Sequence, residues 1–231
     1  MRVGDFTALD QAGLNLQAVL DLDALPAEML AKLRQDHDPE HRYRQLILIG
    51  HAGQSMWNAV KAAAIPSENP IDDFSVATVE RWFATHFADS AHAIIYPGEG
   101  PVGLQALGRI AGWHHVSPFM IGISETWGTW YAYRAVLLAD TDLQPTVAVR
   151  EDSPCTRCAD RICIASCPAG ALDDGAFVLE KCLSYRKEPA SRCRATCLAR
   201  VSCPVGSVHR YCDEQIAHTY SISMKMIARY Y

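Results

Sequence analysis

The sequence predicts a mixed fold of the α+β (α/β) class, with a layered domain over residues 1–150 followed by a cysteine module over residues 151–231. Two observations support this prediction. Helical patterns alternate with short apolar runs through the first part, as expected where helices pack on a sheet. All nine cysteines lie between Cys155 and Cys212, so the second part carries a different chemistry from the first.

The first cycle of elements ends near residue 64. Residues up to about 40 are expected to be helical, because apolar residues recur at helical spacings, and Pro26 marks the start of a second helix. The run Gln45–Gly50 is short, continuously apolar and closed by glycine, which is typical of a buried strand. A helix is expected over residues 55–64.

A second cycle follows the same order. Asp72 or Asp73 precedes a helix from Ser75 through His86, and residues 92–96 predict the next strand. Residues 97–101 form a loop, and residues 102–111 a helix. Between residues 119 and 140, two apolar strands flank residues 125–128, which are typical of a hairpin turn. Residues 141–152 then link this domain to the cysteine module.

Composition excludes some classes of protein. Hydrophobic content of 49% and charged content of 20% are ordinary for a soluble chain. No apolar run is long enough to span a bilayer, and the first residues lack the basic and apolar regions of a signal peptide, so a cytoplasmic protein is expected. The formal net charge of −5 also lacks the basic footprint of nucleic-acid binding.

The cysteine spacing indicates iron–sulfur clusters. The bacterial ferredoxin run is C-x2-C-x2-C-x3-C-P, and its fourth cysteine serves the other cluster. This chain keeps the C-x3-C-P end at Cys163 and Cys167, with two extra residues after Cys158. A second group of cysteines also ends in Cys-Pro, at Cys203. Two [4Fe–4S] clusters are therefore predicted.

Crossing the two motifs, as in ferredoxins, assigns the ligands. The first cluster takes Cys155, Cys158, Cys163 and Cys203, and the second takes Cys167, Cys182, Cys193 and Cys197. Cys212 is left over as a buried or spare thiol, or as an alternative to Cys203. A single cluster, a structural zinc or disulfides are the other readings, but zinc gives no reason for two Cys-Pro steps, and disulfide density belongs to exported mini-proteins.

Three further motifs lie in order between Gly100 and Cys203. They are Pro101-Val102 with Ala111-Gly112-Trp113, Gly128-Thr129-Trp130 with residues 135–140, and Glu180-Lys181-Cys182-Leu183-Ser184-Tyr185. Their order and spacing resemble the A-P-V-L-E…A-G-L-G-W, G-S-W…G-E-L-L-V-D and R-R-C-I-S-Y motifs of epoxyqueuosine reductases, the cobalamin-dependent enzymes of tRNA modification. The reductive dehalogenases are more distantly similar.

The resemblance implies a nitroreductase-like domain that holds cobalamin, fed with electrons by a bacterial-ferredoxin-like module with two clusters. It suggests a corrinoid site formed by Tyr96, His114, His115 and Trp127. Imidazole can ligate cobalt or donate a proton near neutral pH, so His114 is also a candidate catalytic residue.

This chain departs from the family at two positions. Gly98 stands where the family has its catalytic aspartate, which makes the neighbouring Glu99 a candidate substitute, and Val116 stands where the family has a lysine. His51 follows a buried strand, where strand ends often meet ligands. Tyr220 and the last residues of the chain are expected to form a packed terminal segment.

Two classes of function fit these patterns. The first is a reductase that passes single electrons from the clusters to a corrinoid or other substrate, or that reduces cobalt for another enzyme. The second is a non-catalytic electron carrier or partner subunit without cobalamin, which the lost aspartate and lysine favour. Either function needs a redox partner protein such as a flavodoxin, a ferredoxin or a reductase.

Overall fold

The computed structural model describes residues 3–149, 151–173 and 176–231. They form two compact units. Unit 1 comprises residues 1–112 and 131–149, and unit 2 comprises residues 113–130 and 150–231. The chain therefore enters unit 2 twice, and residues 113–130, which the sequence pattern grouped with the N-terminal domain, belong to the same unit as the cysteines.

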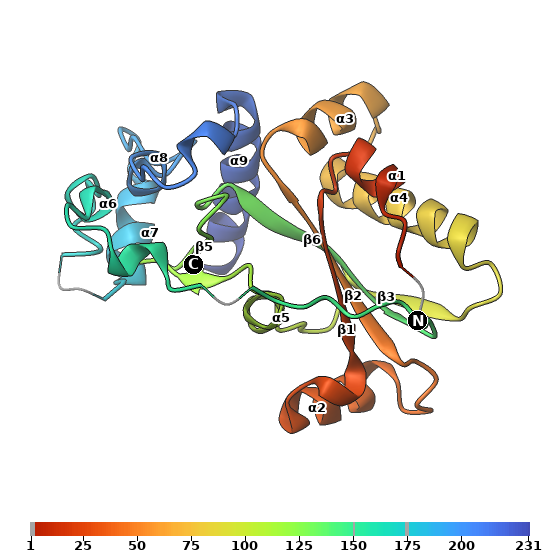
Figure 1. Ribbon diagram of the computed structural model, residues 1–231. Coiled ribbons are helices and arrows are strands. Elements are labelled where there is room, and N and C mark those ends of the chain that lie inside the picture. Colours follow the sequence, from red (N-terminus) through yellow and green to blue (C-terminus); the bar gives the residue numbers. More distant parts are fainter. Residues whose placement is uncertain (1–2, 150, 174–175) are drawn as a thin grey trace. The chain divides into compact units, whose positions relative to one another are not determined.

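Unit 1 is built on a four-stranded sheet with the order β1-β2-β6-β3 (Figure 1). The strands are β1 (Leu16–Asp21), β2 (Gln45–Ala52), β3 (His92–Tyr96) and β6 (Tyr131–Ala139). Every neighbouring pair is antiparallel. The fold is thus mixed helix and sheet of the α+β class, because helices alternate with strands along the chain while the sheet itself is antiparallel.

Helices pack against this sheet. They are α1 (Thr7–Gln11), α2 (Ala27–His37), α3 (Ser55–Ala63), α4 (Pro70–His86) and α5 (Leu104–Ile110), with a short 3₁₀ turn, η1, at Leu22–Ala24. Helices α1, α3 and α4 gather on one side of the sheet (Figure 1), where α4 contacts both of the other helices and β6. Leu46 to Ile49 of β2 are fully buried, which explains the continuous apolar run.

Two sequence predictions are wrong. Residues 14–20 were expected to be helical, but β1 occupies most of them because Val19 pairs with Ile47 and Ala18 with Leu48 along the edge of the sheet. The second concerns the two apolar strands that were expected to flank a turn at residues 125–128. The turn is present and is closed by two backbone hydrogen bonds between Ser124 and Gly128. The strand after it, β6, pairs with β2 and β3 and not with a strand before the turn.

Unit 2 consists of short elements connected by loops. They are β4 (His115–Val116), β5 (Gly122–Ile123), η2 (Pro154–Thr156), α6 (Ile162–Ala165), α7 (Leu179–Lys187), α8 (Leu198–Val201), η3 (Ser207–His209) and α9 (Asp213–Tyr230). Helix α9 buries Ile216, Tyr220 and Ile227 on one face, while the terminal Tyr230 and Tyr231 are exposed, contrary to the expected packed terminus. None of the described helices combines the length and apolar character needed to cross a bilayer.

Candidate functional site

Eight cysteines of unit 2 gather in two groups of four. Group A is Cys155, Cys158, Cys163 and Cys203, and group B is Cys167, Cys182, Cys193 and Cys197. Within each group the thiols lie close enough for one thiolate to raise the pKa of another. Each group also lines a cavity of its own. This division is the one obtained by crossing the ferredoxin motifs, while the role of the thiols as iron ligands stays a prediction.

Group A is assembled from one local segment and one distant cysteine. Cys155 lies in η2, where its backbone N–H donates to Ser153 Oγ at 3.3 Å. Cys163 lies in α6 and is 8% exposed. Cys203 comes from the loop after α8, and the two residues inserted after Cys158 fall in an exposed bend before α6. The widened spacing therefore changes a surface loop and leaves the grouping of the thiols intact.

The Cys203 loop is fixed by a backbone crossing. A Cβ atom on Gly128 would collide with the carbonyl oxygen of Val205, and one on Gly206 would collide with the backbone of Trp127 and Gly128. Both glycines have positive φ, 56° and 62°. Only glycine fits this close approach without strain, so the Gly128-Thr129-Trp130 motif has a structural reason.

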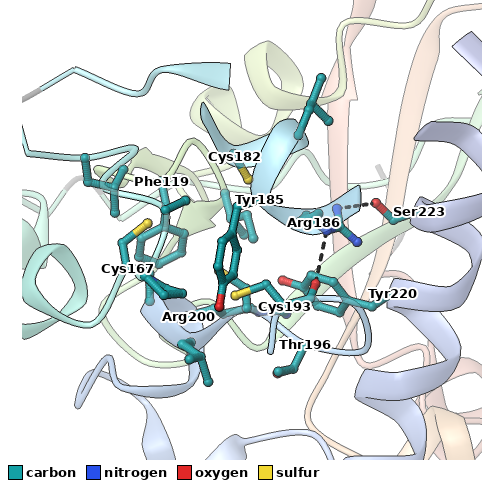
Figure 2. A pocket seen from close by; sticks show the side chains of 18 of the residues that line it. Phe119, Cys167, Cys182, Tyr185, Arg186, Cys193, Thr196, Arg200, Tyr220 and Ser223 are labelled. Atoms are coloured by element: carbon teal, nitrogen blue, oxygen red, sulfur yellow. Dashed lines mark hydrogen bonds between the residues drawn. The ribbon is translucent and has the colours of Figure 1, made fainter. Parts of the chain in front are cut away.

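Group B surrounds a cavity of about 380 Å³ (Figure 2). Cys182 comes from α7, and Cys197 is the residue that precedes α8. Apolar side chains, among them Phe119 and Leu172, complete the wall. The cavity thus combines four thiols with a mainly apolar lining, as expected where a cysteine-bound group is kept from water.

Burial makes the free thiols of both groups hard to ionise. It raises the pKa of Cys182 to about 11, and the neighbouring thiols of Cys197, Cys167 and Cys193 add to the rise. Burial also raises the pKa of Cys155, Cys163, Cys197 and Cys203. Four thiols gathered this closely favour a polynuclear cation that binds them as thiolates and balances their charge. In the described ranges no set of three His, Cys, Asp or Glu residues is arranged around a single ion.

Two buried arginines show that group B suits a negatively charged group. Arg186 and Arg200 are 8% and 6% exposed, and neither pairs with a carboxylate among the residues described. Arg186 Nη2 and Arg200 Nε are buried without a hydrogen-bond partner there. Burying an unpaired cation is costly, and a tetra-thiolate [4Fe–4S] cluster would supply the missing negative charge. The residues present therefore fit such a cluster.

Cys212 belongs to neither group. It is the residue that precedes α9, and it lines neither of the two cysteine cavities. Its role, as a spare thiol or as an alternative to Cys203, stays a prediction.

Unit 1 contains a separate polar cluster around Arg134. Arg134 Nε donates to Nδ1 of the fully buried His51 at 2.9 Å, and Arg134 Nη1 lies 3.8 Å from Asp72 Oδ1. Burial raises the pKa of Tyr96, and the charge of Arg134 partly offsets that rise. Arg134 therefore bonds to His51 and acts through its charge on Tyr96, although these two candidates come from different strands.

The remaining candidates are divided between the units. Glu99 lies exposed in the loop after β3 of unit 1. His114, His115 and Trp127 belong to unit 2, where His114 is 4% exposed and the Trp127 ring is 4.3 Å from that of His209. Their joint role in a corrinoid site stays a prediction.

Sequence reasoning missed Arg186 of the group B site. Arg200 belongs to a surplus of arginines that the sequence places near the cysteines, where they are expected to balance negatively charged clusters. Tyr220 was expected to be packed, and it is buried, but its place in the group B site was not predicted. The sequence held a partial signal for Tyr220, because Ile216, Tyr220 and Ile227 follow the spacing of one helical face. The proximity of that face to cysteines some 25 to 55 positions away in the sequence could not be read from spacing alone.

Comparisons with known proteins show similarity in fold. No protein-family model and no curated protein matches the sequence. Among solved structures, epoxyqueuosine reductase from Streptococcus thermophilus matches 87% of this chain at a TM-score of 0.53 and 15% identity. The chain spans only 64% of that enzyme's length. A further epoxyqueuosine reductase structure, solved with a tRNA stem loop, matches 92% of this chain and 67% of its own at a TM-score of 0.55 and 13% identity.

A protein with a different stated role has the same fold. The B12-trafficking protein CblC from C. elegans matches 93% of this chain and 88% of its own length, with a TM-score of 0.54 and 11% identity. The chain thus has an epoxyqueuosine reductase-like and CblC-like fold. At these identities the likeness concerns the fold alone, and the chemistry must be argued from the site.

Proposed function

We propose that this chain is an iron–sulfur reductase in which groups A and B each hold a [4Fe–4S] cluster and single electrons reach a corrinoid or another substrate bound by unit 1. The observation that carries the proposal is the gathering of eight of the nine cysteines into two sets of four. A cluster bound by four thiolates supplies one-electron transfer at a potential that the surrounding protein adjusts.

The chain's own residues have defined tasks in this proposal. The eight thiolates hold the clusters, the apolar wall of the group B cavity excludes water, and Arg186 and Arg200 balance charge. The Gly128–Gly206 crossing positions the Cys203 loop. A redox partner protein such as a flavodoxin, a ferredoxin or a reductase would supply the electrons.

The corrinoid part of the proposal has its own support. Both groups of similar structures, the epoxyqueuosine reductases and the B12-trafficking protein, have this fold. We propose that Tyr96 of unit 1 contacts the corrinoid and that Glu99 is a candidate proton donor. A corrinoid role for His114, His115 and Trp127, and proton donation by His114, stay expectations from the family resemblance.

A second candidate function is a non-catalytic electron carrier or partner subunit without cobalamin. The exposure of Glu99 favours it. A solvated glutamate one position away from the family's aspartate is poorly placed for proton transfer, and Gly98 and Val116 cannot replace the missing acid and lysine. In this case the clusters would serve a partner protein.

One experiment separates these functions. The full chain would be purified without oxygen, its iron and sulfide counted, and its visible and EPR spectra recorded before and after adding dithionite. Hydroxocobalamin would then be added to the reduced protein. About eight irons per chain, together with the spectrum of reduced cobalamin, are expected.

The possible outcomes differ clearly. About eight irons without any change in the cobalamin spectrum would favour the electron carrier. A single bound metal ion without sulfide would contradict the proposal and favour a structural metal site.

A further inference from the structure

Tyr220 lines the group B cavity together with two buried arginines (Figure 2). The guanidinium carbon of Arg186 is 5.2 Å from the centre of the Tyr220 ring. Burial raises the pKa of the Tyr220 hydroxyl, and the charge of Arg200 partly offsets that rise. Tyr220 is 8% exposed, so all three side chains are nearly fully buried. They come from α7, α8 and α9, and the arrangement therefore depends on the packing of three helices.

The Tyr220 hydroxyl connects this arrangement to a cysteine. Burial raises the pKa of the Cys197 thiol, and the Tyr220 hydroxyl partly offsets that rise. Cys197, Arg200 and Tyr220 line the same cavity. The polar end of Tyr220 therefore acts on a sulfur of group B.

The arginines are themselves held in place. Arg186 Nε donates to the carbonyl oxygen of Cys193 at 3.1 Å, and its Nη1 donates to Ser223 Oγ at 2.9 Å. Arg200 Nη2 donates to the carbonyl oxygen of Thr129 at 2.6 Å, and its guanidinium carbon is 4.5 Å from the centre of the Trp130 ring. These contacts keep both charges buried, where they are weakly screened.

Group A has a different environment. A cavity of about 560 Å³ opens beside three of its cysteines, next to the exposed Val116 and Met120. The cation that acts on Cys155 is Arg161, whose side chain is exposed. Water screens such a charge strongly. The two groups therefore differ in solvent access and in buried positive charge.

We propose that the Arg186–Tyr220–Arg200 arrangement raises the reduction potential of the cluster on group B above that of the cluster on group A. Reduction adds one electron, and one negative charge, to a cluster. Buried cations and a hydroxyl group that acts on a cluster sulfur stabilise the more negative state. This inference rests on the proposed function, because it requires both groups to hold clusters.

The test is a redox titration of the full, cluster-containing chain with dithionite, followed by EPR. Tyr220→Phe removes only the hydroxyl, and we expect it to make reduction of one cluster about tenfold less favourable, equivalent to about 59 mV for a one-electron couple. The other cluster should keep its potential. A Cys182→Ala variant, which lacks a group B thiolate, identifies the signal that belongs to group B.

Tyr185→Phe is the matched control. Tyr185 lines the same cavity, but its hydroxyl accepts from the backbone N–H of Arg192 at 3.5 Å. Both potentials should therefore stay unchanged. If Tyr220→Phe does not fold, Arg200→Lys and Arg200→Gln test the same point, because only the second removes the charge and should lower the potential of the group B cluster.

The outcomes of this test distinguish failure of the inference from failure of the proposed function. Iron and sulfide for fewer than two clusters in the unsubstituted protein would overturn both the proposed function and this inference. Two intact clusters with a lower potential on group B, or with no response to Tyr220→Phe, would overturn this inference alone.

Discussion

Gly128 and Gly206 cross with their backbones in contact, close to the loop that brings Cys203 to group A. Gly128 belongs to the turn before β6, and Gly206 follows Cys203 by three residues. Both have left-handed backbone conformations. The place of one group A thiol therefore depends on two residues that have no side chain.

Gly128→Ala is expected to remove one cluster selectively. The new methyl group would collide with the carbonyl oxygen of Val205, which cannot move without displacing the Cys203 loop. We expect about half of the iron to be lost, with the group B signal retained in EPR.

Gly53→Ala is its control. Gly53 also has a positive φ of 73°, but a Cβ atom there meets no other atom within 4 Å. That substitution should lower the free energy of unfolding by only about 1 kcal/mol, the strain of a left-handed alanine. It should leave the iron count unchanged. Equal iron counts in the two variants would contradict the role of the crossing.

Part of the fold and the grouping of the cysteines could be predicted from the sequence. Crossing the two Cys-Pro motifs gives the same two sets of four cysteines that line the two cavities, while their role as cluster ligands stays a prediction. Strand β3 and helix α3 were also predicted, because each has a clear periodicity. These features depend on residues that are near one another in the chain.

Prediction from the sequence failed where contacts between distant segments determine the structure. Strand β1 was taken for a helix because its apolar residues also fit helical spacing, and only pairing with Ile47 and Leu48 of β2 selects the strand. No local pattern distinguishes Arg186 or Arg200 from an exposed arginine. Their burial follows from the packing of α7, α8 and α9, which no local pattern encodes.

Asp38→Asn is expected to destabilise unit 1. Asp38 is 2% exposed, is paired with Arg34, and accepts from the backbone N–H of Arg42 at 2.7 Å. Removing its charge leaves Arg34 without its buried partner, which costs about 3–5 kcal/mol. Asp36→Asn is the matched control, since Asp36 pairs with the exposed Lys32 on the same helix. It should lower the free energy of unfolding, measured in urea, by less than about 1 kcal/mol. Equal decreases in the two variants would argue against a stabilising role of the buried pair.

Tyr133 should make unit 1 sensitive to alkali. Burial raises its pKa to about 12, above the value of about 10 for an exposed tyrosine. The folded state therefore disfavours the phenolate, so this contribution to stability is complete below about pH 10 and falls as the pH rises toward 12. Thermal unfolding between these pH values should show a smaller decline for Tyr133→Phe than for the unsubstituted chain. Tyr231→Phe, which changes an exposed tyrosine, should decline like the unsubstituted chain.

Cysteine substitutions test the two groups directly. Cys163→Ala and Cys182→Ala each remove one thiol from a different group, so each variant should retain about four irons. Cys212 lines neither cysteine cavity, and Cys212→Ala should retain about eight. Iron and sulfide would be counted on anaerobically purified protein, and EPR of the reduced variants would show which signal is missing.

Comparing the EPR signals of the two single variants and the double variant gives the more decisive test. If the groups are independent sites, Cys163→Ala and Cys182→Ala lose different EPR signals, and the double variant loses both. Loss of the same signal in both single variants would mean that the thiols of groups A and B serve one cluster. Loss of iron in Cys212→Ala would instead assign Cys212 a ligand role in group A, in place of Cys203.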